Sequence, residues 1–183
     1  MKKFKINKKL LGDGYPVYFI ADIAANHDGD LNRAKNLIEL AKVNGANAVK
    51  FQHHDVTHYV NDHGFKSLGK KFSHQKKWKK SIYEVYKDAE VSTKWTTELK
   101  DFADKIEIDF FSTPYDLNIV DHLNDYVPAY KIGSGDLNWD QMLIKVASKK
   151  KPVFLATGAS TKKEVLHAYK VLVNEKIPFC IMQ

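Results

Sequence analysis

The fold is decided by residues 17–29, which read VYFIADIAANHDG. Their apolar, β-rich first half predicts a strand over Val17–Ile23. A doubly wound nucleotide-binding sheet carries a glycine-rich turn after its first strand, but this strand runs into the polar and acidic residues 26–29. The stretch therefore favours a (β/α) barrel, because barrels place polar functional side chains at the carboxyl ends of their strands.

Strand and helix signals alternate along the rest of the chain. Apolar runs predict five further strands, at Ala48–Gln52, Ile106–Ser112, Ala129–Gly133, Pro152–Thr157 and Pro178–Gln183. Amphipathic patterns predict helices at Leu31–Asn44, from Thr96 or Thr97 to Lys105, and at Tyr115–Tyr126, Asp140–Lys149 and Thr161–Asn174. This regular alternation is typical of a mostly parallel sheet.

We expect an α/β fold of the TIM-type (β/α) barrel class, with about six of the eight βα units present. A complete barrel takes roughly 250 residues, and this chain has 183. An incomplete barrel leaves exposed sheet edges at its first and last strands.

Residues 55–94 interrupt the alternation. We expect a long loop there, with one helix near Lys80–Ala89. The segment carries aromatic residues at Phe65, Trp78, Tyr83 and Tyr86. Ordinary packing and the shaping of an active site both remain open for them.

The chain carries a formal net charge of +7, and almost all of its positive charge is lysine. The densest lysine cluster spans residues 70–80. Such a surface is either simply exposed to solvent, or it attracts an anionic small molecule or a nucleic acid. Because no recognised nucleic-acid motif accompanies the cluster, we expect no nucleic-acid partner.

The composition is that of a folded globule, with 44% apolar and 28% charged residues. The longest apolar stretch, Val17–Ala25, is far shorter than a membrane span. No apolar segment of a secretory signal follows the basic first residues. We therefore expect a cytoplasmic protein with no membrane partner.

Two lysines are predicted to face the barrel axis from different strands. Alternation directs Lys50 and Gln52 to one face of their strand and Phe51 to the other. Lys131 is directed inward in the same way. Two buried ammonium groups are costly without a dianion between them, which indicates an anionic ligand. The alternative for Lys50 is a structural ion pair with Asp22.

Hydroxyl groups accompany the lysines at the strand ends. Ser134 lies between two glycines, where open backbone and a hydroxyl suit a phosphate or a carboxylate. Ser112 and Thr113 end one strand, and Ser160 and Thr161 follow another. These four residues are either ligand contacts or helix N-caps.

We predict no metal site within this chain. The acidic loop at residues 26–30 lacks the terminal glutamate of a calcium loop. A lone histidine such as His27 is more often a hydrogen-bonding loop residue than a metal ligand.

Five ordered blocks resemble one enzyme family, the N-acetylneuraminate (sialic acid) synthases, which include legionaminate and related nonulosonate synthases. The blocks are residues 19–29, 45–52, 111–114, 128–135 and 157–158. The match runs from about Val17 to Gln183. The resemblance implies that residues 1–183 are a single N-terminal portion of a synthase barrel, without the family's C-terminal antifreeze-like domain.

The resemblance implies a transferase. Family members condense phosphoenolpyruvate with the open-chain aldehyde of an N-acyl hexosamine, typically N-acetylmannosamine. Phosphate leaves by C–O cleavage, and the product is a nonulosonate, a 2-keto sugar acid. A divalent metal, Mn²⁺ or Mg²⁺, polarises the aldehyde in the family, and its ligands are absent from this chain. A homodimer is implied for the full-length enzyme.

The resemblance also assigns roles by matching position. Lys50, Thr113, Lys131 and Ser134 are expected to hold phosphoenolpyruvate. Gln52 is expected to contact the sugar.

Three further positions depart from the family pattern or vary within it. Asp22 stands where the family usually has Glu, and with Lys50 and Lys131 it forms the expected catalytic group. Asp136, where Glu is also common, is expected to orient neighbouring groups in the substrate site. Ala156 replaces a serine that contacts phosphate in some members.

Two readings of the chain remain open. In one, it is part of an enzyme, although this chain alone lacks the metal half of the site. In the other, it is a truncated, non-catalytic barrel that acts only through oligomerisation or partner binding.

Overall fold

The computed structural model describes residues 3–68 and 78–183 and contains a six-stranded parallel sheet whose strands follow chain order. The strands are β3 (Ile20–Ala24), β4 (Ala48–His53), β5 (Asp109–Pro114), β6 (Tyr130–Ile132), β7 (Val153–Ala156) and β8 (Phe179–Met182). Each pairs in parallel with the next, from β3 through to β8. The predicted α/β class and the incomplete TIM-type barrel of six strands are confirmed. Within the described part of the chain, β3 and β8 are the edge strands.

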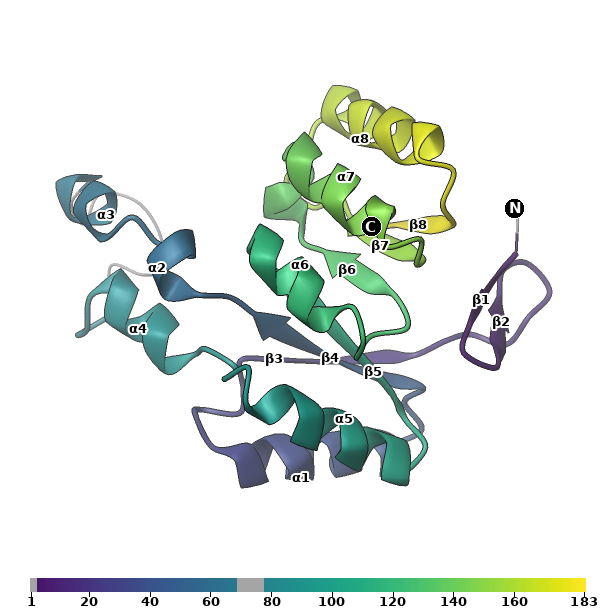
Figure 1. Ribbon diagram of the computed structural model, residues 1–183, viewed down its shortest axis with the longest axis horizontal. Coiled ribbons are helices and arrows are strands. Elements are labelled where there is room, and N and C mark those ends of the chain that lie inside the picture. Colours follow the sequence, from purple (N-terminus) through teal and green to yellow (C-terminus); the bar gives the residue numbers. More distant parts are fainter. Residues whose placement is uncertain (1–2, 69–77) are drawn as a thin grey trace.

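Helices connect the strands and cover one face of the sheet (Figure 1). They are α1 (Leu31–Val43), α5 (Trp95–Lys105), α6 (Leu117–Leu123), α7 (Asp140–Ser148) and α8 (Lys162–Asn174). All five lie where the sequence patterns predict them. No helix in the described ranges is long and apolar enough to cross a membrane.

The N-caps of α6 and α8 show which of the hydroxyl residues at the strand ends cap a helix. Thr161 is the N-cap of α8, and its side chain forms a capping box with Glu164. The capping alternative is wrong for Ser112 and Thr113, because both lie inside β5 and Asp116 caps α6. The hydroxyl of Ser112 lies 2.7 Å from Nδ1 of the buried His53 instead.

Residues 55–94 hold more structure than the sequence indicates. The predicted helix near residues 80–89 is confirmed as α4 (Ile82–Asp88). Two short helices were not predicted, namely α2 (Val56–Tyr59) and α3 (Asp62–Leu68). Most of the lysine cluster, residues 70–77, lies outside the described residues.

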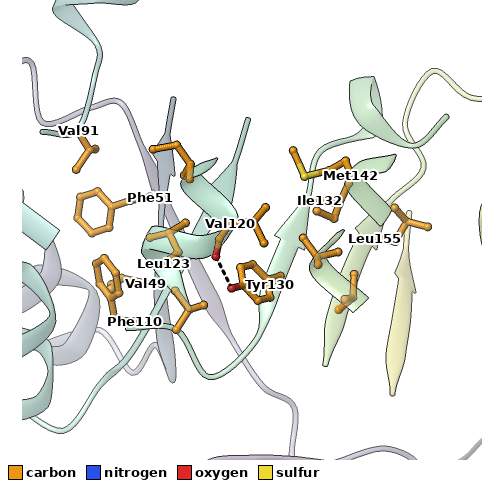
Figure 2. Close-up of a cluster of buried hydrophobic side chains, with 14 of the residues drawn as sticks. Val49, Phe51, Val91, Phe110, Val120, Leu123, Tyr130, Ile132, Met142 and Leu155 are labelled. Carbon is orange, nitrogen blue, oxygen red and sulfur yellow. Dashed lines mark hydrogen bonds between the residues drawn. The ribbon is translucent and has the colours of Figure 1, made fainter. Parts of the chain in front are cut away.

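The larger apolar core lies between the sheet and its helices. Val49, Phe51 and Phe110 point from β4 and β5 toward this layer (Figure 2). The fully buried Tyr130 on β6 donates its hydroxyl proton to the carbonyl of Val120 in α6, at 2.8 Å. Burial of these apolar side chains stabilises the fold, and Tyr130 keeps a hydrogen bond for its buried hydroxyl.

A second apolar cluster lies on the opposite face of the sheet, near the amino ends of the strands. It is formed by Ile6, Ala48, Phe111, Ala129 and Phe154. Ile6 belongs to an antiparallel hairpin of β1 (Phe4–Ile6) and β2 (Lys9–Leu11), which was not predicted. The hairpin lies at one end of the molecule and α2–α4 lie at the other (Figure 1). The amino end of the inner face is therefore covered.

Asp109, at the start of β5, ties the hairpin region to the sheet. Its two oxygens accept hydrogen bonds from Asn7 and Tyr18, each at 2.6 Å, and from Lys9 at 3.3 Å. Burial, together with the neighbouring Asp109 carboxylate, raises the pKa of Tyr18, so the phenol keeps its proton and donates it. One carboxylate thus satisfies three donors from the N-terminal segment.

We expect Asp109→Ala to lower the free energy of unfolding by about 1–3 kcal/mol, because it leaves the partly buried Tyr18 hydroxyl without its acceptor. Urea denaturation followed by circular dichroism measures the change. Asp101→Ala, at an exposed position of α5, is the matched control and should have little effect. Equal stability of the two variants would contradict the role of Asp109.

Candidate active site

Alternation along the strands places the candidate residues on the inner face. Lys50 and Gln52 of β4 point inward while Phe51 packs in the outer core. Thr113 of β5 and Lys131 of β6 follow the same rule, since Phe110 and Tyr130 belong to the outer core. On the inner face, the apolar row at the strand starts is followed by a polar row toward the strand ends.

The polar row borders one cavity of about 470 Å³. Its lining comprises Lys50, Gln52, Tyr59, Thr113, Tyr115, Lys131, Gly133, Ser134, Gly135, Asp136 and Ala156. Six of the seven residues proposed from the sequence are therefore brought together. The seventh, Asp22, contacts the cavity's Lys50.

Lys50 forms the ion pair with Asp22 that the sequence left open. Its Nζ lies 2.8 Å from Oδ1 of Asp22, in the parallel register that places the two residues side by side. The Lys50 side chain is 9% exposed, whereas that of Asp22 is 63% exposed. Asp22 therefore neutralises one lysine from the solvent side and leaves the interior of the cavity open.

Lys131 has no comparable partner. Its Nζ donates to the carbonyl of Ile132 at 3.0 Å, and no ion pair to a carboxylate is found for it among the described residues. Burial lowers the pKa of Lys131 to about 8, and the positive charge of Lys50 acts in the same direction, while Asp22 partly opposes both. An anion bound in the cavity would raise the pKa of Lys131 back toward its ordinary value.

Ser134 and Asp136 come from the short helix η3 (Ser134–Asp136), which directly follows β6. Burial raises the pKa of the Asp136 carboxyl above its ordinary value. Gly133 and Gly135 flank Ser134 without adopting positive φ. A Cβ atom at Gly135 would have no neighbour within 4 Å, so the cavity is open beside this glycine.

Two lining residues, Tyr59 and Tyr115, were not predicted. The amide of Gln52 donates to the hydroxyl of Tyr115 at 2.9 Å. Tyr115 follows Thr113 by two residues, so its place at the carboxyl end of β5 was the signal that could have found it. Tyr59 lies in α2, which no sequence pattern indicated.

His27 is a buried loop residue. Its Nδ1 accepts the amide proton of Gly29 at 3.1 Å, and its ring meets Trp95 edge to face. Burial lowers the pKa of His27, which keeps the ring neutral.

The described residues do not fit the divalent metal that the resemblance implies. No group of three or more His, Cys, Asp or Glu side chains able to hold a metal is found in them. The carboxylate of Asp22 beside the cavity is already engaged by Lys50. We therefore assign no step to a metal held by these residues.

Comparison with known proteins places the chain in a family. A model described as the NeuB family matches residues 37–183. The chain belongs to the NeuB family. This confirms the resemblance to the sialic acid and nonulosonate synthases.

Individual relatives agree with the family match. This NeuB chain is 41% identical to an uncharacterized protein, MJ1065, of Methanocaldococcus jannaschii, covering 95% of the chain and 47% of that protein. It is 36% identical to the N,N'-diacetyllegionaminic acid synthase of Campylobacter jejuni, covering 84% of the chain and 46% of the synthase. The chain thus spans about half the length of these relatives.

A solved structure shows the same fold. The N-acetylneuraminic acid (sialic acid) synthetase of Leptospira borgpetersenii, crystallised in complex with citrate, is 28% identical and superposes with a TM-score of 0.85. The superposition covers 98% of this chain and 58% of the synthetase. The NeuB chain therefore corresponds to a part of the longer synthetase.

The unpaired charge of Lys131 has a measurable cost. We expect Lys131→Met to raise the melting temperature by a few degrees at pH 7, because it removes a poorly solvated charge beside Lys50. The folded chain holds this proton less tightly than the unfolded chain, whose lysine pKa is near 10.5. Wild-type stability should therefore rise relative to the variant between about pH 8 and pH 10.5.

Thermal melts of both proteins across this pH range test the expectation. Lys170→Met, at an exposed position of α8, serves as the control and should leave the melting temperature at pH 7 nearly unchanged. A destabilised Lys131→Met at pH 7 would show that the lysine is satisfied within the fold.

Proposed function

We propose that this chain supplies the phosphoenolpyruvate-binding part of a nonulosonate synthase. The enzyme joins phosphoenolpyruvate to the open-chain aldehyde of an N-acyl hexosamine of the N-acetylmannosamine type. It releases phosphate and yields a 2-keto sugar acid for the biosynthesis of sialic-acid-like sugars. Family membership and the synthases among its relatives support the proposal.

One observation carries the proposal. Lys50 and Lys131 come from strands β4 and β6, which are separated by β5, yet both line one cavity. Only Lys50 has a carboxylate partner in the described part of the chain. A ligand with two anionic groups, such as the carboxylate and phosphate of phosphoenolpyruvate, supplies the charge that this pair of ammonium groups lacks.

The hydroxyl groups complete the anion site in this proposal. Thr113 and Ser134 line the same cavity and can donate to phosphate or carboxylate oxygens. Ala156 lines it as well and offers no such donor, so the contact made by a serine in some family members is lost here.

The reaction forms one carbon–carbon bond and one carbon–oxygen bond, and it breaks one carbon–oxygen bond. C3 of phosphoenolpyruvate bonds to the aldehyde carbon, whose oxygen takes up a proton. The oxygen of water bonds to C2, and the bond from C2 to the bridging oxygen breaks, so that phosphate departs with that oxygen. Water gives up both of its protons as C2 becomes the ketone: one balances the proton taken up by the aldehyde oxygen, and the other leaves with phosphate. In this scheme Lys50 and Lys131 neutralise the departing phosphate, and Asp136 accepts a proton. Asp22 holds Lys50 in place beside the reacting carbons.

In the proposal, Gln52 is the contact that this chain makes with the acceptor sugar. We assign the divalent metal, the remaining sugar contacts and the homodimer to the rest of a longer protein, since this chain covers 46% of the legionaminic acid synthase.

We expect Lys131→Ala to abolish phosphate release by the full-length enzyme and to weaken phosphoenolpyruvate binding by about tenfold or more, because one charge-assisted contact is lost. A colorimetric phosphate assay and calorimetric titration measure the two effects. Lys170→Ala is the control and should retain both phosphate release and phosphoenolpyruvate binding. Phosphate release at the wild-type rate would remove Lys131 from the site.

The non-catalytic alternative rests on the open edges of the sheet. β3 and β8 each have one neighbour in the described structure, and unpaired edges invite a partner. We expect the intact mass of the natural protein to exceed 21.0 kDa clearly, because the enzyme needs the rest of the barrel. Mass spectrometry of the protein from its source decides this. A mass near 21.0 kDa would require a second polypeptide to complete the barrel.

A further inference from the structure

A chain of hydrogen-bonded polar side chains lies in the helix layer, on the face of the sheet opposite the anion cavity. Nδ1 of His53 lies 2.7 Å from the hydroxyl of Ser112, and Nε2 of His53 lies 3.0 Å from the hydroxyl of Thr96. The same Thr96 hydroxyl lies 2.9 Å from Nε2 of His122. His53, Ser112 and Thr96 are fully buried, whereas His122 is partly exposed. The chain therefore joins β4 and β5 to α5 and α6.

The imidazole of His53 is neutral and is held at both of its nitrogens. Burial lowers the pKa of His53 to about 3, and the nearby rings of His122, His54 and His27 act in the same direction. A neutral imidazole has one N–H donor and one acceptor nitrogen, and a hydroxyl group can complement either. Because each nitrogen faces one hydroxyl, the orientation of the ring is fixed from both sides.

The partner of His53 within the sheet adjoins the lining of the anion cavity. Gln52 precedes His53 in β4, and Thr113 follows Ser112 in β5. Gln52 and Thr113 both line the cavity and stand opposite each other in the parallel register. Successive side chains of a strand point to opposite faces, so a bond behind the sheet holds the backbone that presents these two residues in front.

The backbone of His53 reaches a third lining residue. Its carbonyl accepts the amide proton of Tyr115 at 3.0 Å, and the hydroxyl of Tyr115 accepts a proton from the Gln52 amide at 2.9 Å. The carboxyl ends of β4 and β5 are thus joined by side-chain bonds on both faces of the sheet. His53 itself does not belong to the cavity lining.

The two side-chain bonds of His53 act in different places. Thr96 lies in α5, so the bond to Thr96 attaches a helix to the outer face of the sheet. Ser112 lies in β5, one residue from the cavity lining. Loss of either bond leaves a buried polar atom unpaired and costs stability. Only loss of the bond to Ser112 loosens the backbone next to Thr113.

We propose that His53 is a positioning residue for the anion cavity, which places Gln52 and Thr113 through its hydrogen bond to Ser112. The inference rests on the proposed function, because it takes phosphoenolpyruvate to be the ligand of the cavity. His53 touches no ligand and acts from the opposite face of the sheet. The ligand affinity of the cavity therefore depends on Nδ1 of this ring and not on Nε2.

Two substitutions of His53 in the full natural protein separate positioning from stability. The shorter amide of His53→Asn can take the place of Nδ1 and keep the bond to Ser112, whereas the longer amide of His53→Gln can take the place of Nε2 and keep the bond to Thr96. Each variant loses one buried hydrogen bond and the ring, so the melting temperatures should fall by similar amounts. We expect His53→Gln to weaken phosphoenolpyruvate binding by about tenfold and His53→Asn to stay within about twofold of the wild type.

A second pair of variants removes the partners and leaves the ring in place. Ser112→Ala should weaken phosphoenolpyruvate binding by about tenfold, as His53→Gln does. Thr96→Val is the matched control, because it also removes one hydroxyl from the chain but should leave the affinity unchanged. Calorimetric titration with phosphoenolpyruvate measures the affinities, and thermal melts show that the variants in each pair are equally stable.

The outcomes distinguish this inference from the proposed function. Equal phosphoenolpyruvate affinity of His53→Gln and His53→Asn would overturn the positioning role, as would equal affinity of Ser112→Ala and Thr96→Val. In both cases binding by the wild type, lost on Lys131→Ala, would leave the proposed function standing. Absence of phosphoenolpyruvate binding to the wild type would overturn both.

Discussion

Two lysine ammonium groups lie on the inner face of one sheet, and only one of them is paired with a carboxylate in the described structure. The chemistry of the molecule depends on this excess of positive charge. Asp22 satisfies Lys50 at 2.8 Å, whereas Lys131 is held by a backbone carbonyl alone in the described structure. Burial, together with the nearby positive charge of Lys50, lowers the pKa of Lys131 to about 8. An anionic ligand bound beside Lys131 would stabilise the folded chain.

The sheet can hold these charges because the rest of the inner face is arranged around them. Toward the strand starts the face is apolar, and Phe111 and Phe154 pack against Ile6 of the hairpin. Asp109 fastens this region through Asn7, Lys9 and Tyr18. The polar side chains that line the cavity lie at the other end, the carboxyl end of the strands, where the loops that follow the strands can shape a binding site.

The segment between β4 and α5 divides the space at that end into two environments. The anion cavity is polar and bordered by lysines, whereas the adjoining pocket is formed by aromatic rings from α2, α4 and their flanking residues. Gln52 and Tyr115 stand at the boundary, joined by a hydrogen bond. This division gives the carboxyl end of the sheet two surfaces of different chemical character, one charged and one aromatic.

Local sequence was sufficient to predict the six strands of the parallel sheet, the five helices that connect them and the direction of the key side chains, but not the hairpin β1–β2 or the short helices α2 and α3. The period of two in residues 48–53 predicts that Lys50 and Gln52 share a face, since a strand has no other way to alternate its side chains. The helix over Leu31–Val43 followed from its apolar spacing and its Asp30 cap. The family blocks pointed to the same residues. Tertiary structure alone decided that Asp22 pairs with Lys50, that Lys131 has no such partner, and that the hairpin and the aromatic segment enclose the site. These features depend on contacts between residues up to 102 positions apart, and no local pattern encodes the distance between such residues.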